Sequence, residues 1–254
     1  MSRPLVMGVL NVTPDSFSDG GLWLDPDAAV AHGLAMAAEG ADVVDVGGES
    51  TRPGAAEVPI EEELRRVVPV IDALAPHVRV SVDTRRREVA EAALGAGATI
   101  VNDVSASLYD VAAVHEAGWV AMHMRGTPLT MQQQAQYDDV VSEVREFLVH
   151  RVRLALAAGV TEVWIDPGLG FAKTADHNLS LLRRLDELVA TGHPVLVGAS
   201  RKSFIGKLTG NAPVDDRAEG SLALAVWAME KGAAMVRVHD VRATVQAARL
   251  VTAA

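Results

Sequence analysis

Polar and charged residues follow short apolar runs along this chain, and their types suit the binding of one shared ligand. Asp166 follows the β-favouring run at residues 162–165 and precedes Pro167-Gly168. Asp-Pro-Gly alone is ordinary turn chemistry, but seven other apolar runs also end in polar residues. These are Asn11, the stretch Asp45 to Glu49, Asp83-Thr84, Asn102-Asp103, His123, Ser200-Arg201-Lys202, and Arg237 with His239-Asp240. An unsatisfied buried polar group costs about 1–3 kcal/mol, so a ligand that satisfies them jointly is the simplest explanation.

The residue types form two chemical sets. The first combines acceptors and donors that suit the edge of a flat heterocycle, since a carboxylate accepts two parallel N–H bonds and an ammonium donates: Asp83, Asn102, Asp166 and Lys202. The second suits anionic oxygens: Asn11, Arg52, Arg237 and His239. Asn11 could also reach a hydrated Mg2+. Together the sets predict a heterocycle that bears phosphate. A nucleoside triphosphate is not expected, because Gly206-Lys207 lacks the upstream glycine of a P-loop.

Eight strands and eight helices are needed to position these residues. The expected strands are valine-rich and nearly continuous in apolar character, as in parallel sheets buried on both faces: 5–10, 42–46, 78–82, 99–104, 119–122, 163–165, 195–197 and 235–238. Stretches with helical spacing lie between them, several of them expected to stop at a glycine such as Gly118: 26–39, 60–75, 85–94, 108–117, 138–158, 176–191, 217–231 and 241–252.

This strict alternation predicts an α/β fold, a (β/α)8 TIM barrel with its active site at the C-terminal ends of the strands. A doubly wound open sheet is the alternative, but the turn after the first strand carries no G-x-G-x-x-G. No linker divides the chain, so residues 1–254 are expected to form one domain. Long connections at residues 11–24 and 47–59 are expected to be binding loops or lids.

Composition excludes several classes of function. The chain has 254 residues, 49% of them hydrophobic and 22% charged, and its formal net charge is −10. This balance argues against a nonspecific nucleic-acid or anionic-membrane binder. The chain has no cysteine, which excludes disulfides and thiolate chemistry. Without a signal-like start or a run of membrane-spanning length, a cytoplasmic protein is expected.

Other polar residues favour ordinary structural interpretations. His123 ends a strand, but we expect a structural histidine with satisfied hydrogen bonds rather than a base. Lys173 lies one turn beyond Asp166 and could simply be solvated. The arginines at 65–66 and 85–87 are typical of solvated helix faces. Ligand contact is the favoured interpretation for Met122 and Phe171, although both could belong to the core.

The motifs, taken together, resemble those of the dihydropteroate synthase family. The resemblance is carried by MGVLNVTPDSFSDGG at 7–21, DVGGESTRPG at 45–54, SVDT at 81–84, VNDV at 101–104, MHMRGTP at 122–128, DPGLGF at 166–171, SRKS at 200–203 and RVHD at 237–240. They occur in family order and span nearly the whole chain, without departure at any motif position. Residues 50–54 resemble the ordinary, sulfonamide-sensitive form.

The resemblance implies a transferase of folate biosynthesis. Its members condense a hydroxymethyl-dihydropterin diphosphate with p-aminobenzoate, giving dihydropteroate and diphosphate. By similarity, the heterocycle set holds the pterin, with Arg237 stacked over it, and Arg237, His239 and Arg52 hold the diphosphate. Asn11 binds the Mg2+ cofactor. The residues implied to border the aminobenzoate are Thr51, Pro53, Phe17, Lys202 and Ser203. The family also implies a homodimer, for which the Ala-rich stretch 221–233 is a candidate surface.

We expect a dissociative displacement. Cleavage of the carbon–oxygen bond places negative charge on diphosphate, where Mg2+ and the basic residues stabilise it. Asp83 and Asp166 favour the cation left on the pterin, while the two loops close and Asp19 orders the first. The expected catalytic residues are Asp83, Asp166, Lys202, Asp19 and Arg52.

Two other functions use the same pterin set. An enzyme that transfers a methyl group from a reduced folate to a corrinoid protein would not need Asn11, Arg52 and His239 to bind diphosphate. A non-catalytic pterin-binding paralogue would tolerate loss of the loop aspartates and Arg52, yet these are present. Diphosphate release that depends on p-aminobenzoate distinguishes all three.

Overall fold

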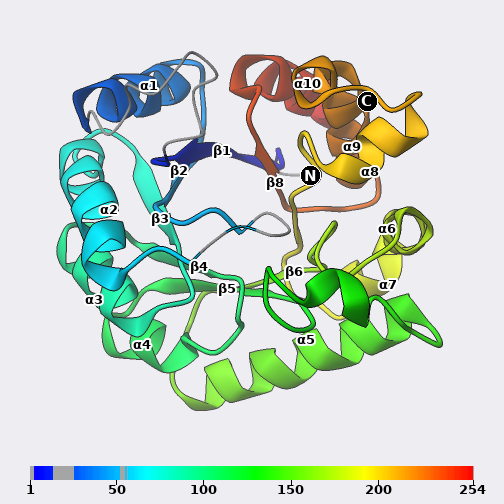
Figure 1. The fold of residues 1–254 in the computed structure, drawn as a ribbon, viewed down its shortest axis with the longest axis horizontal. Coiled ribbons are helices and arrows are strands. Elements are labelled where there is room, and N and C mark those ends of the chain that lie inside the picture. The colour runs from blue at the N-terminus through cyan, green and yellow to red at the C-terminus, as the bar shows by residue number, and fades with distance from the viewer. Residues whose placement is uncertain (1–2, 14–25, 52–54, 56, 254) are drawn as a thin grey trace.

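Eight parallel strands form a nearly closed barrel, surrounded by helices (Figure 1). The computed structural model describes residues 3–13, 26–51, 55 and 57–253. The strands are β1 Leu5–Asn11, β2 Val43–Gly47, β3 Arg79–Asp83, β4 Ile100–Asp103, β5 Gly118–Met122, β6 Val163–Asp166, β7 Leu196–Val197 and β8 Met235–Val238. Their order is β6-β5-β4-β3-β2-β1-β8-β7, and a parallel bridge between Ile165 and Val195 joins the two ends. The predicted TIM barrel is confirmed.

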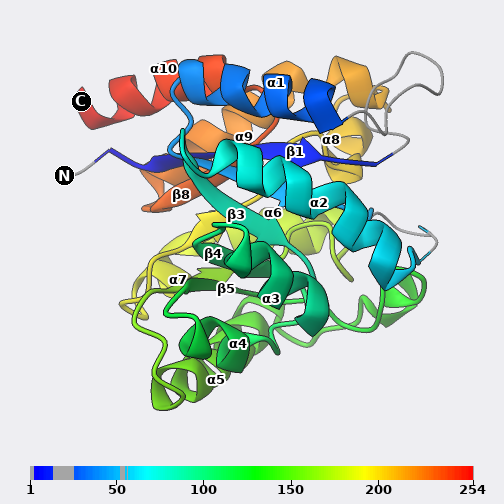
Figure 2. The same ribbon diagram turned by 90° about the vertical axis from the view of Figure 1, so that its left-hand side faces the viewer.

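The helices form the outer layer, as the side view also shows (Figure 2). They are α1 Pro26–Ala38, α2 Ile60–Leu74, α3 Arg87–Gly95, α4 Tyr109–Val114, α5 Val140–Ala157, α6 Ala175–Arg183, α7 Leu185–Val189, α8 Ser203–Leu208, α9 Ala218–Glu230 and α10 Val241–Ala253. Short 3-10 turns lie at Met131–Gln134 and Val214–Asp216.

Three details of the predicted helices were wrong. The stretch 176–191 is two helices, α6 and α7, separated at Arg184, whose side chain bonds Asp139 and Glu187. The short helix α8 was not predicted, and it buries Phe204 and Ile205. Gly118 does not stop a helix; it is the first residue of β5, and Glu116 has the positive φ of 53° after α4.

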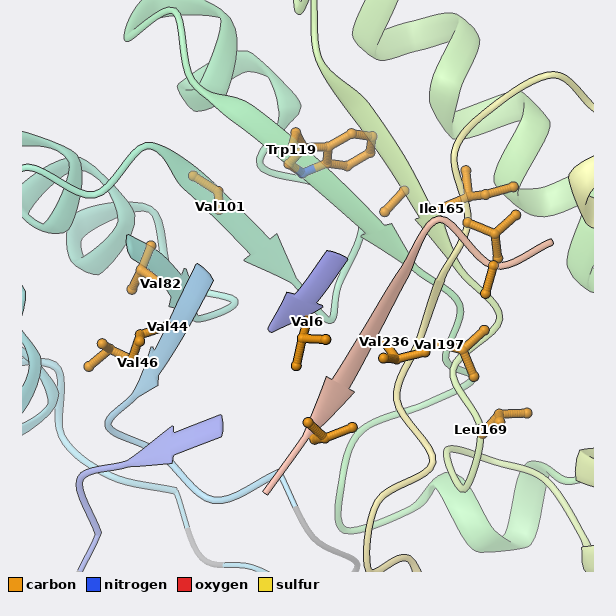
Figure 3. Packing of buried hydrophobic residues seen from close by; sticks show 14 of the residues in the cluster. Val6, Val44, Val46, Val82, Val101, Trp119, Ile165, Leu169, Val197 and Val236 are labelled. Carbon is orange, nitrogen blue, oxygen red and sulfur yellow. The ribbon is translucent and has the colours of Figure 1, made fainter. Parts of the chain in front are cut away.

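Two apolar layers follow from the alternation of side chains along the strands. Outward side chains, among them Val44, Val101 and Ile165, pack with the helices in one continuous core (Figure 3). Inward side chains form a second, smaller cluster inside the barrel: Met7, Val43, Ile100, Val120, Trp164, Leu196 and Met235. This inner cluster is an apolar floor beneath the carboxyl ends of the strands.

Candidate active site

The polar residues of the mouth stand one inward position above the apolar floor. Because side chains alternate with a period of two, the residue two places after a floor residue also points into the barrel. The floor and mouth residues are thus paired along four strands: Val43 with Asp45, Ile100 with Asn102, Trp164 with Asp166, and Met235 with Arg237. In β3, Asp83 follows the buried Ser81 in the same way. Strand geometry therefore brings together side chains that lie far apart in sequence.

A hydrogen-bonded network joins four of these residues across β2, β3, β4 and β8. The Arg237 guanidinium donates from Nε to Asp45 Oδ2 at 2.6 Å and from Nη2 to Asp83 Oδ2 at 2.8 Å. Asn102 Nδ2 donates to the same Asp45 oxygen at 2.9 Å. Asp45 Oδ1 is buried and has no hydrogen-bond partner among the described residues. One arginine therefore fixes two carboxylates, while acceptor capacity remains for a ligand.

Burial and mutual charge perturb the acids and bases of the mouth. Burial raises the pKa of Asp83 from 3.8 to about 7; Arg237 opposes the shift and the Asp45 carboxylate adds to it. Burial likewise raises the pKa of Asp166, against the attraction of Lys202. Burial lowers the pKa of Lys202 to about 8, although Asp166 favours its charged form. Groups that perturb one another in this way share one site.

The connection after β6 brings Phe171 beside Lys202, whose charged form Asp166 at the end of β6 favours. Asp166 Oδ1 accepts a 2.7 Å hydrogen bond from Gly168 N. Gly168 has φ +65°, and a Cβ there would lie 2.0 Å from the His123 carbonyl oxygen, so only glycine fits this close approach. The Lys202 ammonium donates to the Leu169 carbonyl oxygen and lies 4.6 Å from the centre of the Phe171 ring.

Three of the four predicted anion-binding residues lie in or directly after β1 and β8: Asn11, Arg237 and His239. A Cβ at Gly47 would lie 3.7 Å from Asn11 Oδ1 and 3.4 Å from Asp83 Cβ, so Asn11 and Asp83 flank that glycine. His239 Nδ1 lies 2.9 Å from Ser200 Oγ, which fixes the imidazole ring. Asn11 and His239 also line a cavity of about 700 Å³, together with Arg201 and Arg242.

The remaining predicted site residues differ in how far the structure places them. Met122 is buried at the end of β5, Ser203 is the exposed first residue of α8, and Thr51 is half-buried after β2. Four predicted site residues lie outside the described residues: Phe17, Asp19, Arg52 and Pro53. Their proposed roles stay predictions.

Asp45 is the residue that the sequence did not distinguish. Among the predicted strand-end residues it was included only as part of the stretch 45–49. In the structure it is fully buried and joins Arg237 to Asn102. The signal that could have found it is its spacing, because it stands two residues after the inward Val43.

The solvated interpretation of Lys173 was wrong. Its ammonium is buried and contacts His123 Nδ1 at 3.0 Å, and it donates to the carbonyl oxygens of His123 at 3.3 Å and Phe171 at 3.0 Å. Burial, reinforced by Lys173, lowers the pKa of His123 to about 2. A neutral, partnered imidazole is what a structural histidine requires.

The solvated interpretation was also wrong for Arg66, Arg85 and Arg86. Arg66 is buried and bonds the Gly48 carbonyl oxygen, while Arg85 and Arg86 both pair with Glu49. Arg65 and Arg87 are exposed, as expected.

Comparison with known proteins gives the site a family. Residues 7–239 match the pterin-binding enzyme family. The dihydropteroate synthase of Mycobacterium leprae is 54% identical over 262 residues, which cover 98% of this chain and 92% of that protein. The chain belongs to the dihydropteroate synthase family. It is therefore a transferase, and the resemblance in its motifs is confirmed. The dihydropteroate synthase of Escherichia coli K12 is 48% identical, over 100% of this chain and 92% of its own length.

Solved dihydropteroate synthase structures superimpose closely. The Xanthomonas albilineans enzyme with 4-aminobenzoic acid has a TM-score of 0.92 and 50% identity, over 99% of this chain and 93% of that chain. A structure of the same enzyme with 7,8-dihydropteroate gives 0.89 and 47%, with the same coverage. The Yersinia pestis enzyme, in complex with a sulfonamide drug, gives 0.93 and 46%, over 99% and 94%.

Proposed function

We propose that the barrel mouth condenses (7,8-dihydropterin-6-yl)methyl diphosphate with p-aminobenzoate, and that its polar layer binds the pterin. Asp83, Asn102 and Asp166 supply acceptors for the amino and ring N–H groups, and Lys202 donates to the ring carbonyl or a ring nitrogen. The observation that carries this proposal is the cluster of inward polar side chains at the strand ends, in which Arg237 bonds both Asp45 and Asp83, and Lys202 lies close enough to Asp166 and Asp83 for their charges to affect its pKa.

The same geometry suits stabilisation of a pterin cation. Asp83 and Asp166 are acids whose pKa values burial has raised. A ligand that gains positive charge between them would restore their ionised forms and be stabilised in turn. As the bond between the methylene carbon and the diphosphate oxygen breaks, its electron pair leaves with diphosphate. The aniline nitrogen of p-aminobenzoate then attacks the methylene carbon and loses a proton to solvent.

Arg237 and His239 would hold the departing diphosphate. Arg237 lies in β8, and His239 directly follows that strand and is oriented by Ser200. The Arg237 guanidinium already bonds two carboxylates, so its positive charge is fixed in position. By similarity Arg52 completes this set.

Mg2+ would fit at Asn11. Among the described residues no group of three or more acidic or histidine side chains could hold a metal ion. Mg2+ commonly keeps several waters and takes one or two protein oxygens beside substrate phosphates, so a single amide oxygen facing the mouth is a suitable donor. When bound, the ion would neutralise negative charge on the diphosphate.

The aminobenzoate is expected to lie on the outer side of the pterin. Thr51, Lys202, Ser203 and Phe171 are the described candidates, and by similarity Phe17 and Pro53 join them. Sulfonamide binding in this subsite is part of the proposal, supported by the Yersinia pestis complex.

A homodimer in the cytoplasm completes the proposal. Helix α9 carries apolar residues on every side, including the partly exposed Leu224 and Trp227. A helix of this kind is normally covered on more than one face.

None of the helices in the described part of the chain combines the length and apolar character needed to cross a membrane.

The decisive experiment is diphosphate release by the purified protein. With Mg2+ and the pterin diphosphate, release should depend on added p-aminobenzoate, and 7,8-dihydropteroate should form in equal amount. Absence of release under these conditions would reject the proposal. Methyl transfer to a corrinoid protein without diphosphate release would favour the methyltransferase instead.

A further inference from the structure

A buried charge cluster joins the two ends of the connection between β2 and α2. Glu49 Oε1 accepts hydrogen bonds from Val58 N at 3.0 Å and from Arg86 Nη2 at 2.8 Å. Arg86 Nη1 also donates to the Val58 carbonyl oxygen. Glu49 and Val58 are nine residues apart, so one carboxylate and one guanidinium join the two ends of this connection.

The same cluster reaches Thr84, the residue directly after β3 and two residues before Arg86. Thr84 directly follows Asp83, and its hydroxyl donates to Glu63 Oε1 at 2.7 Å and accepts from Arg86 N at 3.2 Å. Glu63 Oε2 in turn lies 3.4 Å from Arg86 Nη1. Arg86 therefore connects the chain that leaves Asp83 with the chain that carries Thr51.

A third contact holds the first residues after β2. Arg66 Nη1 donates to the Gly48 carbonyl oxygen at 2.9 Å. A Cβ at Gly48 would lie 2.8 Å from Val67 Cγ1 and 3.0 Å from Glu63 Cγ, so the backbone here rests directly on α2. Residues of α2 therefore fix the start of the connection, at Gly48. Arg86, in the chain after β3, fixes its two ends to each other.

Burial makes this cluster effective. The side chains of Glu49, Glu63 and Arg86 are 7%, 1% and 14% exposed. Exposed ion pairs contribute little to fixing a conformation, because water screens them and their side chains stay free. Removing one partner of a buried pair leaves an uncompensated charge and disrupts the local structure.

We propose that Glu49 and Arg86 are positioning residues for the second substrate: they fix Ser50-Thr51 relative to Asp83, so that p-aminobenzoate meets the pterin in the correct place. This inference rests on the proposed function. It assigns a role to two residues that contact neither substrate and act through the backbone around Thr51.

The test compares Glu49→Gln and Arg86→Gln with the matched control Arg87→Gln. Arg87 is adjacent in sequence, but its side chain is 48% exposed and pairs with Asp110 at the surface. We expect each of the first two variants to raise the KM for p-aminobenzoate about tenfold. The KM for the pterin diphosphate should stay within about twofold, and Arg87→Gln should leave both values unchanged.

The double variant and thermal melting distinguish positioning from general destabilisation. Because Glu49 and Arg86 bond each other and both bond Val58, the double variant that carries Glu49→Gln and Arg86→Gln should raise the KM for p-aminobenzoate little more than either change alone. Glu49→Asp retains the charge and should give an intermediate KM even if Glu49→Gln does not fold. Equal increases in both KM values, additive effects, or a lowered melting temperature with unchanged KM values would overturn the inference. Failure of the wild-type protein to form dihydropteroate would reject the proposed function instead.

Discussion

Two adjacent residues at the end of β4, Asn102 and Asp103, differ in how far the rest of the chain satisfies their side chains. Asn102 points into the barrel, where its side-chain amide makes one hydrogen bond with the described residues, to Asp45. Asp103 points outward and accepts from Ser105 N and Oγ, Ser107 N, Leu108 N and the Trp119 indole. Both are buried. The outward carboxylate is saturated by its own chain, whereas the inward groups retain capacity for a ligand.

The contrast extends to the other aspartates. Asp45 Oδ1 has no partner in the described chain, and the Asp166 carboxylate accepts one hydrogen bond there, from Gly168 N. Satisfied buried groups stabilise a fold, while unsatisfied ones reduce its stability and are retained where they bind something. Mutations on the two faces should therefore have opposite consequences for stability and activity.

The largest effect is expected from Asp103→Ala. It leaves five donors without their acceptor in a buried turn, so we expect the free energy of unfolding to fall by about 3–5 kcal/mol. Urea denaturation measures this change. Asp110→Ala, on the exposed surface pair with Arg87, should cost no more than about 1 kcal/mol. If Asp103→Ala keeps its stability and loses only activity, Asp103 is a functional residue and not a structural one.

Asp166→Asn should have the converse effect. An amide cannot accept two parallel N–H bonds or support a cation, so kcat/KM for the pterin diphosphate should fall about 10²-fold or more. Because burial disfavours the charge of Asp166, the melting temperature should stay the same or rise. Asp176→Asn is the control, since Asp176 is exposed on α6 and should retain full activity. A large fall in melting temperature would show that Asp166 is a structural residue.

The inward and outward alternation also explains what could be predicted from the sequence. Valine-rich runs separated by helical spacing predicted a parallel sheet buried on both faces. Eight such units, with no G-x-G-x-x-G turn after the first strand, favoured the barrel over an open doubly wound sheet. Strand ends and residue types together placed Asp83, Asn102, Asp166 and Arg237 among the candidates, but strand ends alone did not separate the inward Asn102 from the outward Asp103. Boundaries failed where tertiary contacts decided them, as at Arg184, which bonds a residue 45 positions away.

The cluster residues were missed for a related reason. Arg86 pairs with Glu49, 37 positions away, and Lys173 contacts His123, 50 positions away. In sequence both resemble surface cations, because nothing local reveals the partner that buries them. Charged residues next to a strand end are thus ambiguous until the fold brings their partners together.

Lys173→Met tests a buried cation that bonds groups of its own chain, as Asp103 does. Lys173 therefore has a structural role, although it lies only seven residues after Asp166. Burial lowers the pKa of Lys173 well below 10.5, so the folded chain binds fewer protons at this site than the unfolded chain. Its contribution to stability is therefore present above the ordinary lysine pKa and is lost as pH falls. Methionine does not titrate. The wild-type free energy of unfolding, minus that of the variant, should rise between pH 6 and pH 9, by about 1–2 kcal/mol in urea denaturation. A difference that stays constant over this range would show that the lysine is charged when folded.

Asp83→Asn should give the smallest effect on stability, with the opposite dependence on pH. The folded pKa of Asp83 is raised from 3.8 to about 7, so the folded protein binds more protons here than the unfolded chain between these values. Its contribution to stability is present below pH 3.8 and is lost as pH rises through 7. Asparagine keeps an acceptor for Arg237 and does not titrate. The melting temperature of Asp83→Asn should therefore rise relative to wild type between pH 5 and pH 8, by a few degrees. Asp110→Asn, where Arg87 lowers the pKa of an exposed carboxyl, should show no such rise. If the two variants behave alike, Asp83 is charged in the folded protein, as an ion-pair partner of Arg237. The inward carboxylates would then not differ from Asp103 by being unsatisfied.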